Sequence, residues 1–147
     1  MKPLLINKKA KFEYEYIETL TAGVVLSGGE VKMLRNSKGS LQGSFVRVVD
    51  GEAWLLNAQI PPYPYARNED YDPKQNRKLL LKKKEVAQLL QIQQAKGLTL
   101  VPTAIGLEGR YIKVEVTIAR GKSQGDRRET IRRRDLDRQT ARDLKNY

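Results

Sequence analysis

The sequence predicts a mainly β fold, a small closed antiparallel barrel of about six strands with a basic C-terminal tail. Short segments in which apolar and polar side chains alternate recur along the chain, which is typical of half-buried strands. Asp50-Gly51 lies between two such segments and indicates a tight hairpin. Only residues 79–96 carry apolar side chains at a clear helical spacing. A helix inserted before the last two strands favours an OB-like barrel, a common nucleic-acid-binding fold.

The first two strands are predicted at residues 11–17 and 23–26. In the first, aromatic side chains alternate with charged or polar ones, and the second is a short apolar run closed by Ser27-Gly28-Gly29. Residues 30–35 fit a short helix. The turn-forming residues 36–39 end it.

The third and fourth strands, residues 45–49 and 52–56, flank Asp50-Gly51. This pair suits a type I′ turn, in which both central residues have positive φ angles. A loop rich in proline and tyrosine, residues 60–73, follows the hairpin. The hairpin is the clearest local signal in the chain.

The predicted helix at residues 79–96 turns Val86, Leu89 and Leu90 towards the core and ends at Gly97. The fifth and sixth strands follow at residues 98–105 and 111–119, with a turn through Gly106 and Gly109 between them. In the last strand the apolar residues alternate with polar ones, so one face is apolar. Those apolar residues are Ile112, Val114, Val116 and Ile118.

The composition indicates a partner that carries phosphates. The 147 residues include 28 Lys and Arg against 17 Asp and Glu, a net charge of +11. Such an excess favours nucleic acid or an anionic membrane as partner. No apolar run approaches the length of a membrane span, and the apolar segment within residues 1–9 is too short for a signal peptide. We therefore expect a cytoplasmic protein that binds nucleic acid and no membrane.

The chain contains neither Cys nor His. This excludes disulfides, thiol nucleophiles, imidazole catalysis and His/Cys metal sites. Catalysis would then need convergent carboxylates, but the only dense acidic group is Glu69, Asp70 and Asp72 in a proline-rich loop. We therefore expect no enzyme, no catalytic residue, no metal and no cofactor.

The positive charge is concentrated near the C-terminus. Residues 120–147 hold ten basic and five acidic residues, but few apolar ones. We therefore place a boundary near Gly121, with an OB-like RNA-binding body at residues 1–120 and a basic tail at residues 121–147.

A helix starting near Asp126 would align Arg134, Arg138 and Arg142 as one ridge. Such a helix is polar all round and has nothing to bury, so we expect the tail to be disordered alone and helical on an anionic surface. Arginine pairs with phosphate in a fork geometry, which favours binding over a merely solubilising tail.

Three groups in the body fit either RNA binding or an ordinary solvated surface. Lysines cluster around a leucine run at residues 77–84, where they oppose the dipole of the predicted helix. Lys113 lies on the polar face of the last strand, and Lys32 and Arg35 lie on one side of the short helix. The loop tyrosines suit base stacking or a pinned structural loop. These residues are Tyr63, Tyr65 and Tyr71, beside Arg67 and Lys74.

Five short motifs in collinear order resemble the SsrA-binding protein (small protein B) family. They are Asn7-Lys8-Lys9-Ala10, Ala22-Gly23-Val24-Val25-Leu26-x-Gly28-x-Glu30-Val31-Lys32-x-Leu34-Arg35, Asp72-Pro73-x-x-x-Arg77-Lys78-Leu79-Leu80-Leu81, Gly97-Leu98-Thr99-Leu100-Val101-Pro102 and Gly121-Lys122-x-x-x-Asp126-Arg127-Arg128-Glu129. Together they cover nearly the whole chain. Thr21, Gly125 and Leu136 depart from the usual family pattern.

The resemblance implies an OB-like barrel with three helices and a bacterial protein of trans-translation. It implies binding to the tRNA-like domain of transfer-messenger RNA (tmRNA) and delivery to stalled ribosomes, where incomplete polypeptides are tagged. It also implies that the tail becomes helical in the empty mRNA channel, near the decoding centre of the small ribosomal subunit. We expect a monomer.

The resemblance also implies the residues that bind each partner. In the body, those for RNA are Asn7, Lys8, Glu30, Lys32, Leu80, Lys82, Lys113 and Lys122. In the tail, those for the ribosome are Asp126, Arg127 and Arg128, to which the helical spacing above adds Arg134, Arg138 and Arg142. Two alternatives stay open: an integral ribosomal protein, and an RNA-processing enzyme that would use Mg²⁺ at Glu69 and Asp70.

Overall fold

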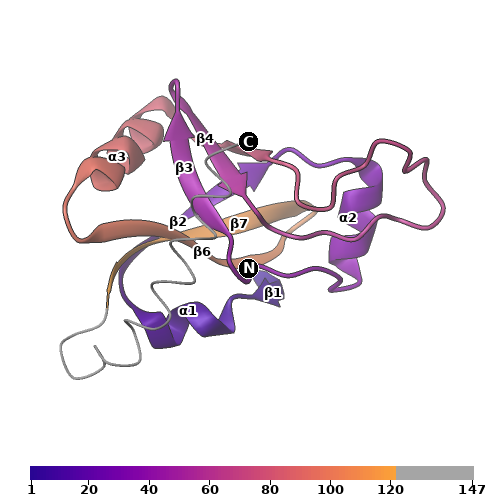
Figure 1. Cartoon of the computed structure of the whole chain (residues 1–147), viewed down its shortest axis with the longest axis horizontal. Coiled ribbons are helices and arrows are strands. Elements are labelled where there is room, and N and C mark those ends of the chain that lie inside the picture. Colours follow the sequence, from indigo (N-terminus) through magenta and orange to yellow (C-terminus); the bar gives the residue numbers. More distant parts are fainter. Residues whose placement is uncertain (122–147) are drawn as a thin grey trace.

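The computed structural model describes residues 1–121, which form one curved antiparallel sheet of seven strands with three helices (Figure 1). The strands are β1 (Lys2–Ile6), β2 (Tyr14–Val24), β3 (Phe45–Val49), β4 (Glu52–Leu56), β5 (Arg77–Leu80), β6 (Leu98–Glu108) and β7 (Tyr111–Gly121). The helices are α1 (Lys8–Glu13), α2 (Gly28–Arg35) and α3 (Lys83–Gln94). Within this described part, no helix is long and apolar enough to cross a membrane.

The sheet is open, so the predicted closed barrel is wrong. Its strand order is β1-β6-β7-β2-β5-β4-β3, and over residues 1–121 no ladder joins the edge strands β1 and β3. At the β3 edge, the Gln93 side chain of α3 accepts a hydrogen bond from the Val48 N–H (2.7 Å) and donates one to the Val48 carbonyl (3.2 Å). Helix α3 therefore occupies part of the β3 edge, at Val48. On β1, Pro3 has no N–H for a further ladder.

The N-terminal region differs most from the predicted elements. Residues 8–13 form α1 and residues 14–24 form the single long strand β2, where two separate strands were predicted. Asn7 starts α1, because its Oδ1 accepts a hydrogen bond from the Ala10 N–H (3.3 Å). This cap outweighs the alternating pattern over the first half of residues 11–17.

The predicted helix at residues 79–96 begins later, at Lys83. Residues Arg77 to Leu80 form β5 instead, which pairs with β2 and β4. Buried Arg77 and Leu79 alternate with the more exposed Lys78 and Leu80, as expected of a strand. The pairing therefore overrides the helical spacing at this end.

The other local predictions are confirmed. Strands β3 and β4 have the predicted bounds, and Asp50 and Gly51 between them have φ angles of 50° and 76°. Helix α2 begins two residues early, because Ser27 and Glu30 form a reciprocal capping box. Strands β6 and β7 are longer than predicted.

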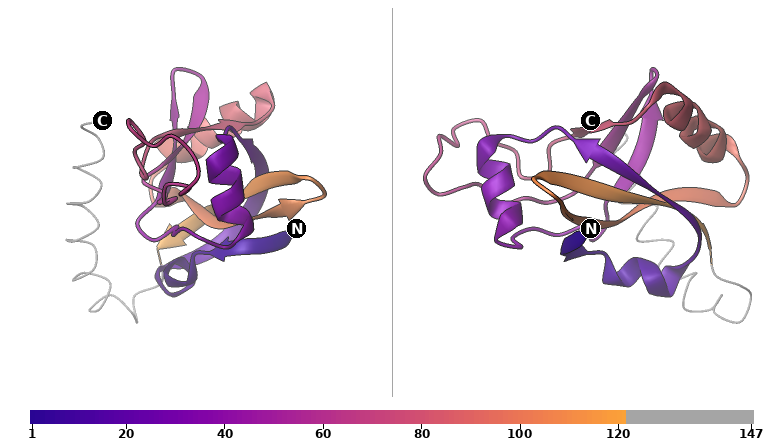
Figure 2. Two further views of the ribbon diagram at one scale, coloured as in Figure 1. Left: turned by 90° about the vertical axis from the view of Figure 1, so that its right-hand side faces the viewer. Right: turned by 180° about the vertical axis from the view of Figure 1, so that it is seen from behind.

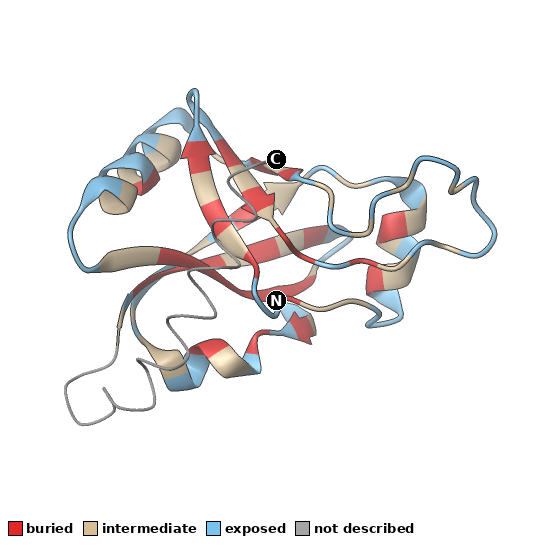
Figure 3. Ribbon diagram, in the orientation of Figure 1, coloured by how far each residue is buried: buried red, intermediate tan, exposed pale blue. Residues whose placement is uncertain are grey.

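The core lies on the inner face of the curved sheet, and two helices contribute to it. Leu34 of α2 and Leu89 of α3 are fully buried and join the same cluster as Leu55, Val114 and Val116 of the strands. Buried positions alternate with intermediate ones along most of β3 and β4 (Figure 3). Figure 2, like Figure 1, shows α2 and α3 at opposite ends of the molecule. The sheet between them holds two of the predicted binding residues, Leu80 and Lys113.

Candidate RNA-binding surface

Three neighbouring strands bring two of the predicted RNA-binding residues together. Gly23 of β2 pairs with Leu80 of β5 on one side and with Lys113 of β7 on the other. Side chains of directly paired residues lie on the same face of a sheet. Leu80 and Lys113, distant in sequence, therefore flank Gly23 on one face.

Gly23 allows the close approach of Leu80. A Cβ atom added at Gly23 would lie 3.1 Å from the Leu80 Cβ and 3.5 Å from its Cδ1. The Leu80 side chain thus lies over bare backbone, and it is 53% exposed. An apolar side chain so placed offers a flat contact for a ribose or a base.

Lys113 lies beside an aromatic residue that the sequence reasoning missed. Its Nζ atom is 5.9 Å from the ring centroid of Tyr111, which is 71% exposed. The sequence does contain a signal for this residue. Tyr111 precedes Lys113 by two residues and therefore lies on the same face of β7. An exposed tyrosine beside a lysine suits contact with a base and its phosphate.

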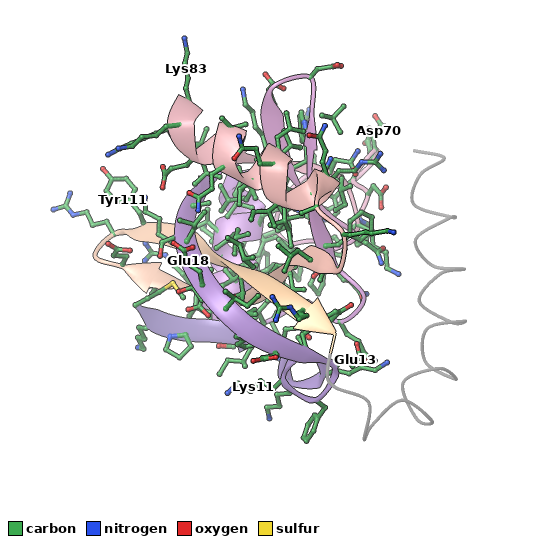
Figure 4. All side chains as sticks on the ribbon, turned by 90° about the vertical axis from the view of Figure 1, so that its left-hand side faces the viewer. Lys11, Glu13, Glu18, Asp70, Lys83 and Tyr111 are labelled. Atoms are coloured by element: carbon green, nitrogen blue, oxygen red, sulfur yellow. The ribbon has the colours of Figure 1, made fainter. Side chains whose placement is uncertain are left out.

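Lys82 stands at the start of α3, where its backbone N–H donates to the Glu85 carboxylate (3.0 Å). The side chains of Lys82, Lys83 and Lys84 are exposed. Figure 4 shows Lys83 and Tyr111 projecting on the same side of the molecule. We name the group formed by Gly23, Leu80, Lys82, Tyr111 and Lys113 the Leu80–Lys113 surface.

Glu30, in contrast, is buried inside the fold. Its side chain is 3% exposed and forms an ion pair with the equally buried Arg77, with 2.6 Å between Oε2 and Nε. Its other oxygen accepts a hydrogen bond from the Ser27 N–H (3.0 Å). Both carboxylate oxygens of Glu30 are therefore used within the fold. Lys32, two residues further along α2, has its Nζ atom 5.0 Å from the centroid of the Tyr63 ring.

The Glu30–Arg77 pair anchors the tyrosine-rich loop. Arg77 donates to the carbonyls of Ala58 (2.7 Å) and Pro73 (3.0 Å) and to the Tyr71 hydroxyl (3.3 Å). The Tyr71 hydroxyl donates in turn to the Ile60 carbonyl (2.7 Å). One buried guanidinium thus ties both ends of the loop to β5.

The electrostatics of this pair favour the charged forms. Burial raises the pKa of Glu30, but the hydrogen bond from Ser27 and the charge and hydrogen bonds of Arg77 outweigh it, so the pKa lies below its ordinary value. For Tyr71, burial and the neighbouring Glu30 raise the pKa above its ordinary value. The Glu30 carboxylate therefore stays ionised near neutral pH.

Asn7 and Lys8 lie away from the Leu80–Lys113 surface, beside α1. Asn7 is buried and its side chain is fully used, since the amide donates to the carbonyls of Pro102 (3.0 Å) and Leu41 (3.4 Å) while its oxygen caps α1. Lys8 is exposed and lines a hollow of about 270 Å³ next to residues 39–42. Of this pair, only Lys8 is accessible to a partner.

No group of three acidic residues able to hold a metal ion occurs in the part of the chain that the structure describes. The remaining predicted residues lie outside residues 1–121. They are Lys122, Asp126, Arg127, Arg128, Arg134, Arg138 and Arg142.

Comparison with known proteins identifies the family. The model of the SmpB protein family matches residues 4–146. An SsrA-binding protein of Levilactobacillus brevis is 44% identical over 96% of this chain and 90% of its own length. One of Chelativorans sp. is 47% identical over 95% of this chain and 90% of its own.

A solved structure shares the fold. It is described as "tmRNA-SmpB: a journey to the center of the bacterial ribosome", and its matching chain is 44% identical with a TM-score of 0.70. The match covers 88% of this chain and 94% of that one. The resemblance seen in the motifs is thereby confirmed, and the chain belongs to the SsrA-binding protein (SmpB) family.

Proposed function

We propose that the chain binds the tRNA-like domain of tmRNA and delivers it to stalled ribosomes for trans-translation. The observation that carries the proposal is the Leu80–Lys113 surface, on which an apolar side chain, an exposed tyrosine and lysines adjoin a glycine. Family membership supports it, as do the tmRNA and the ribosome named for the structural neighbour.

In this proposal the body works by binding alone. Lys82 and Lys113 neutralise phosphates, and Leu80 and Tyr111 contact sugars or bases. Phosphate contacts set affinity and orientation, while the apolar contacts distinguish this RNA from others of equal charge. The body performs no catalytic step, and cofactor and metal are both unnecessary for such binding.

The tail supplies the second half of the proposed function. The tail contacts the decoding centre and the mRNA channel of the small subunit. It does so through Asp126, Arg127 and Arg128 and through the arginines of residues 134–142. This division assigns tmRNA to the body and ribosomal RNA to the tail.

The test is a comparison of RNA affinities. Binding of the chain to tmRNA is measured against binding to an unrelated structured RNA of equal length, at physiological salt. We expect a clear preference for tmRNA, with log K falling by roughly 0.7–0.9 per phosphate contact as log salt rises. Equal affinities would remove the proposed specificity.

The division between body and tail has its own test. Replacing Asp126, Arg127 and Arg128 together with Ala should leave tmRNA affinity unchanged and block tagging on stalled ribosomes. Filter binding and a reconstituted tagging assay measure the two effects separately. Loss of tmRNA affinity in this variant would show that the tail also binds tmRNA.

A further inference from the structure

Three sequence features that the proposed function leaves unused meet in one cleft. They are the Gly28-Gly29 pair, the tyrosine-rich loop and the acidic residues of that loop. The cleft measures about 560 Å³ and lies between the start of α2 and the loop. Its walls include Gly28, Gly29, Tyr63, Arg67, Asp70 and Tyr71. We propose that it holds one unpaired nucleobase of an RNA partner.

The aromatic wall of the cleft is held in place before any partner binds. The Tyr71 hydroxyl lies 2.7 Å from the Ile60 carbonyl and 3.2 Å from the Glu30 carboxylate, and it accepts a hydrogen bond from Arg77. The Tyr71 ring therefore cannot swing away from the cleft. Fixing a stacking surface in advance removes part of the entropy cost of binding. Glu30 and Arg77 act as positioning residues for the cleft.

The glycine pair leaves the floor of the cleft without side chains. A Cβ atom at Gly29 would lie 3.0 Å from the Tyr63 Cβ, so Tyr63 packs directly on the first turn of α2. A Cβ atom at Gly28 would meet nothing within 4 Å. Gly28 lines the cleft and has open space around it, so a larger side chain fits at this position without a clash.

The charges around the cleft favour a base over a phosphate. Glu69 and Asp70 line it and repel a phosphate, whereas a neutral base stacks on tyrosine. Lys32, above the Tyr63 ring, and Arg67 are placed to meet the phosphates next to that base.

The cleft is separate from the Leu80–Lys113 surface. In Figure 4, Asp70 lies on the opposite side of the molecule from Lys83 and Tyr111. The base in the cleft therefore belongs to a different RNA segment from the one on that surface. This inference depends on one part of the proposed function, namely that the chain binds RNA. The base comes either from tmRNA or from ribosomal RNA, and the experiment separates the two.

The test blocks the cleft with Gly28→Leu and uses Gly28→Ala as the matched control. Affinity for free tmRNA is one arm, and affinity of the tmRNA complex for stalled ribosomes is the other. From the stacking contribution of a single base, we expect Gly28→Leu to weaken binding by between about 5-fold and about 100-fold in one of the two arms. Gly28→Ala adds only a methyl group and should weaken binding in that arm by less than Gly28→Leu does. The arm that responds identifies the source of the base.

Wild-type binding in both arms with a folded Gly28→Leu protein would overturn the inference. A second measurement needs no variant: ultraviolet crosslinking of the native complexes should join RNA to the peptide that contains Tyr63 and Tyr71. Absence of that crosslink from both complexes also overturns it. Failure of the proposed function looks different, because tmRNA would then bind no better than unrelated RNA whatever residue stands at position 28.

Discussion

Arg77 and Lys113 are both cationic, but they lie in different surroundings. Arg77 is buried in an ion pair with Glu30, whereas Lys113 lies at the surface of the sheet. Glu30 and Arg77 are at most 3% exposed and satisfy each other and the loop carbonyls, while Lys113 is partly exposed on the outer face of β7. Buried charges that are paired cannot turn to a partner without leaving an unpaired charge behind. The family resemblance implies an RNA-binding role for Glu30 and for Lys113 alike, so it does not by itself separate a residue buried in the fold from one that is accessible to RNA.

The largest expected effect comes from breaking the buried pair. Arg77→Met leaves the Glu30 carboxylate buried without its partner, and we expect a loss of about 3–5 kcal/mol in the free energy of unfolding. The neighbouring Lys78 is the control, because its ion pair with Glu52 (3.1 Å) is exposed and Lys78→Met should cost less than about 1 kcal/mol. Urea unfolding at pH 7 measures both. Similar losses for the two variants would contradict the comparison.

The next largest effect is on RNA binding. Lys113→Ala removes a phosphate contact, and we expect tmRNA affinity to fall about tenfold and the salt slope to decrease by about 1. The free energy of unfolding should change by less than about 0.5 kcal/mol. Lys11→Ala, an exposed lysine on α1, is the matched control and should bind normally. A loss of stability in place of affinity would assign Lys113 to the fold.

The pH dependence of stability should also follow the buried pair. Because the folded pKa of Glu30 lies below its unfolded value, its contribution is complete above the unfolded pKa of about 4.3 and is lost as pH falls through the folded pKa. Native protein should therefore lose stability below about pH 4 more steeply than Glu30→Gln, which cannot titrate there. Unfolding curves between pH 3 and pH 7 test this. Parallel curves would show that Glu30 does not supply the effect.

The smallest effect concerns the contact between Gly23 and Leu80. Gly23→Ala places a methyl group 3.1 Å from the Leu80 Cβ, so Leu80 must move by a few tenths of an ångström. We expect tmRNA affinity to fall about threefold, and this loss to shrink when Gly23→Ala is made in a Leu80→Ala protein, which keeps the Cβ atom but lacks the apolar side chain beyond it. Titrations on the four proteins form a double-mutant cycle. Additive losses would mean that Gly23 acts independently of Leu80.

Local signals in the sequence predicted local structure well. Asp50-Gly51 predicts its hairpin because the turn needs two positive φ angles, which no distant contact alters. The open sheet was not predictable in this way. Its edge is occupied by the Gln93 side chain, which reaches Val48 from α3, and no periodicity in either segment reports such a contact. Residues 77–80 were misassigned for the same reason, since their pairing with β2 and β4 is long-range.

The binding surface was predictable only in part. The family resemblance indicated Leu80 and Lys113, but their shared position across Gly23 follows from strand order, which the sequence does not show. Tyr111 was missed although its spacing to Lys113 placed it on the same face. Glu30 illustrates the opposite case, because a carboxylate within a basic motif gives no sign of its burial against Arg77.

The central claim is that the Leu80–Lys113 surface recognises tmRNA. Its most direct test is the ratio of affinities for tmRNA and for an unrelated structured RNA, measured for the native chain and for Leu80→Ala/Lys113→Ala at one salt concentration. We predict that the ratio is well above one for the native chain and falls close to one for the variant. The free energy of unfolding of the variant should stay within about 2 kcal/mol of the native value, because Leu80 is half exposed. A variant that is folded and keeps the native ratio would contradict the claim.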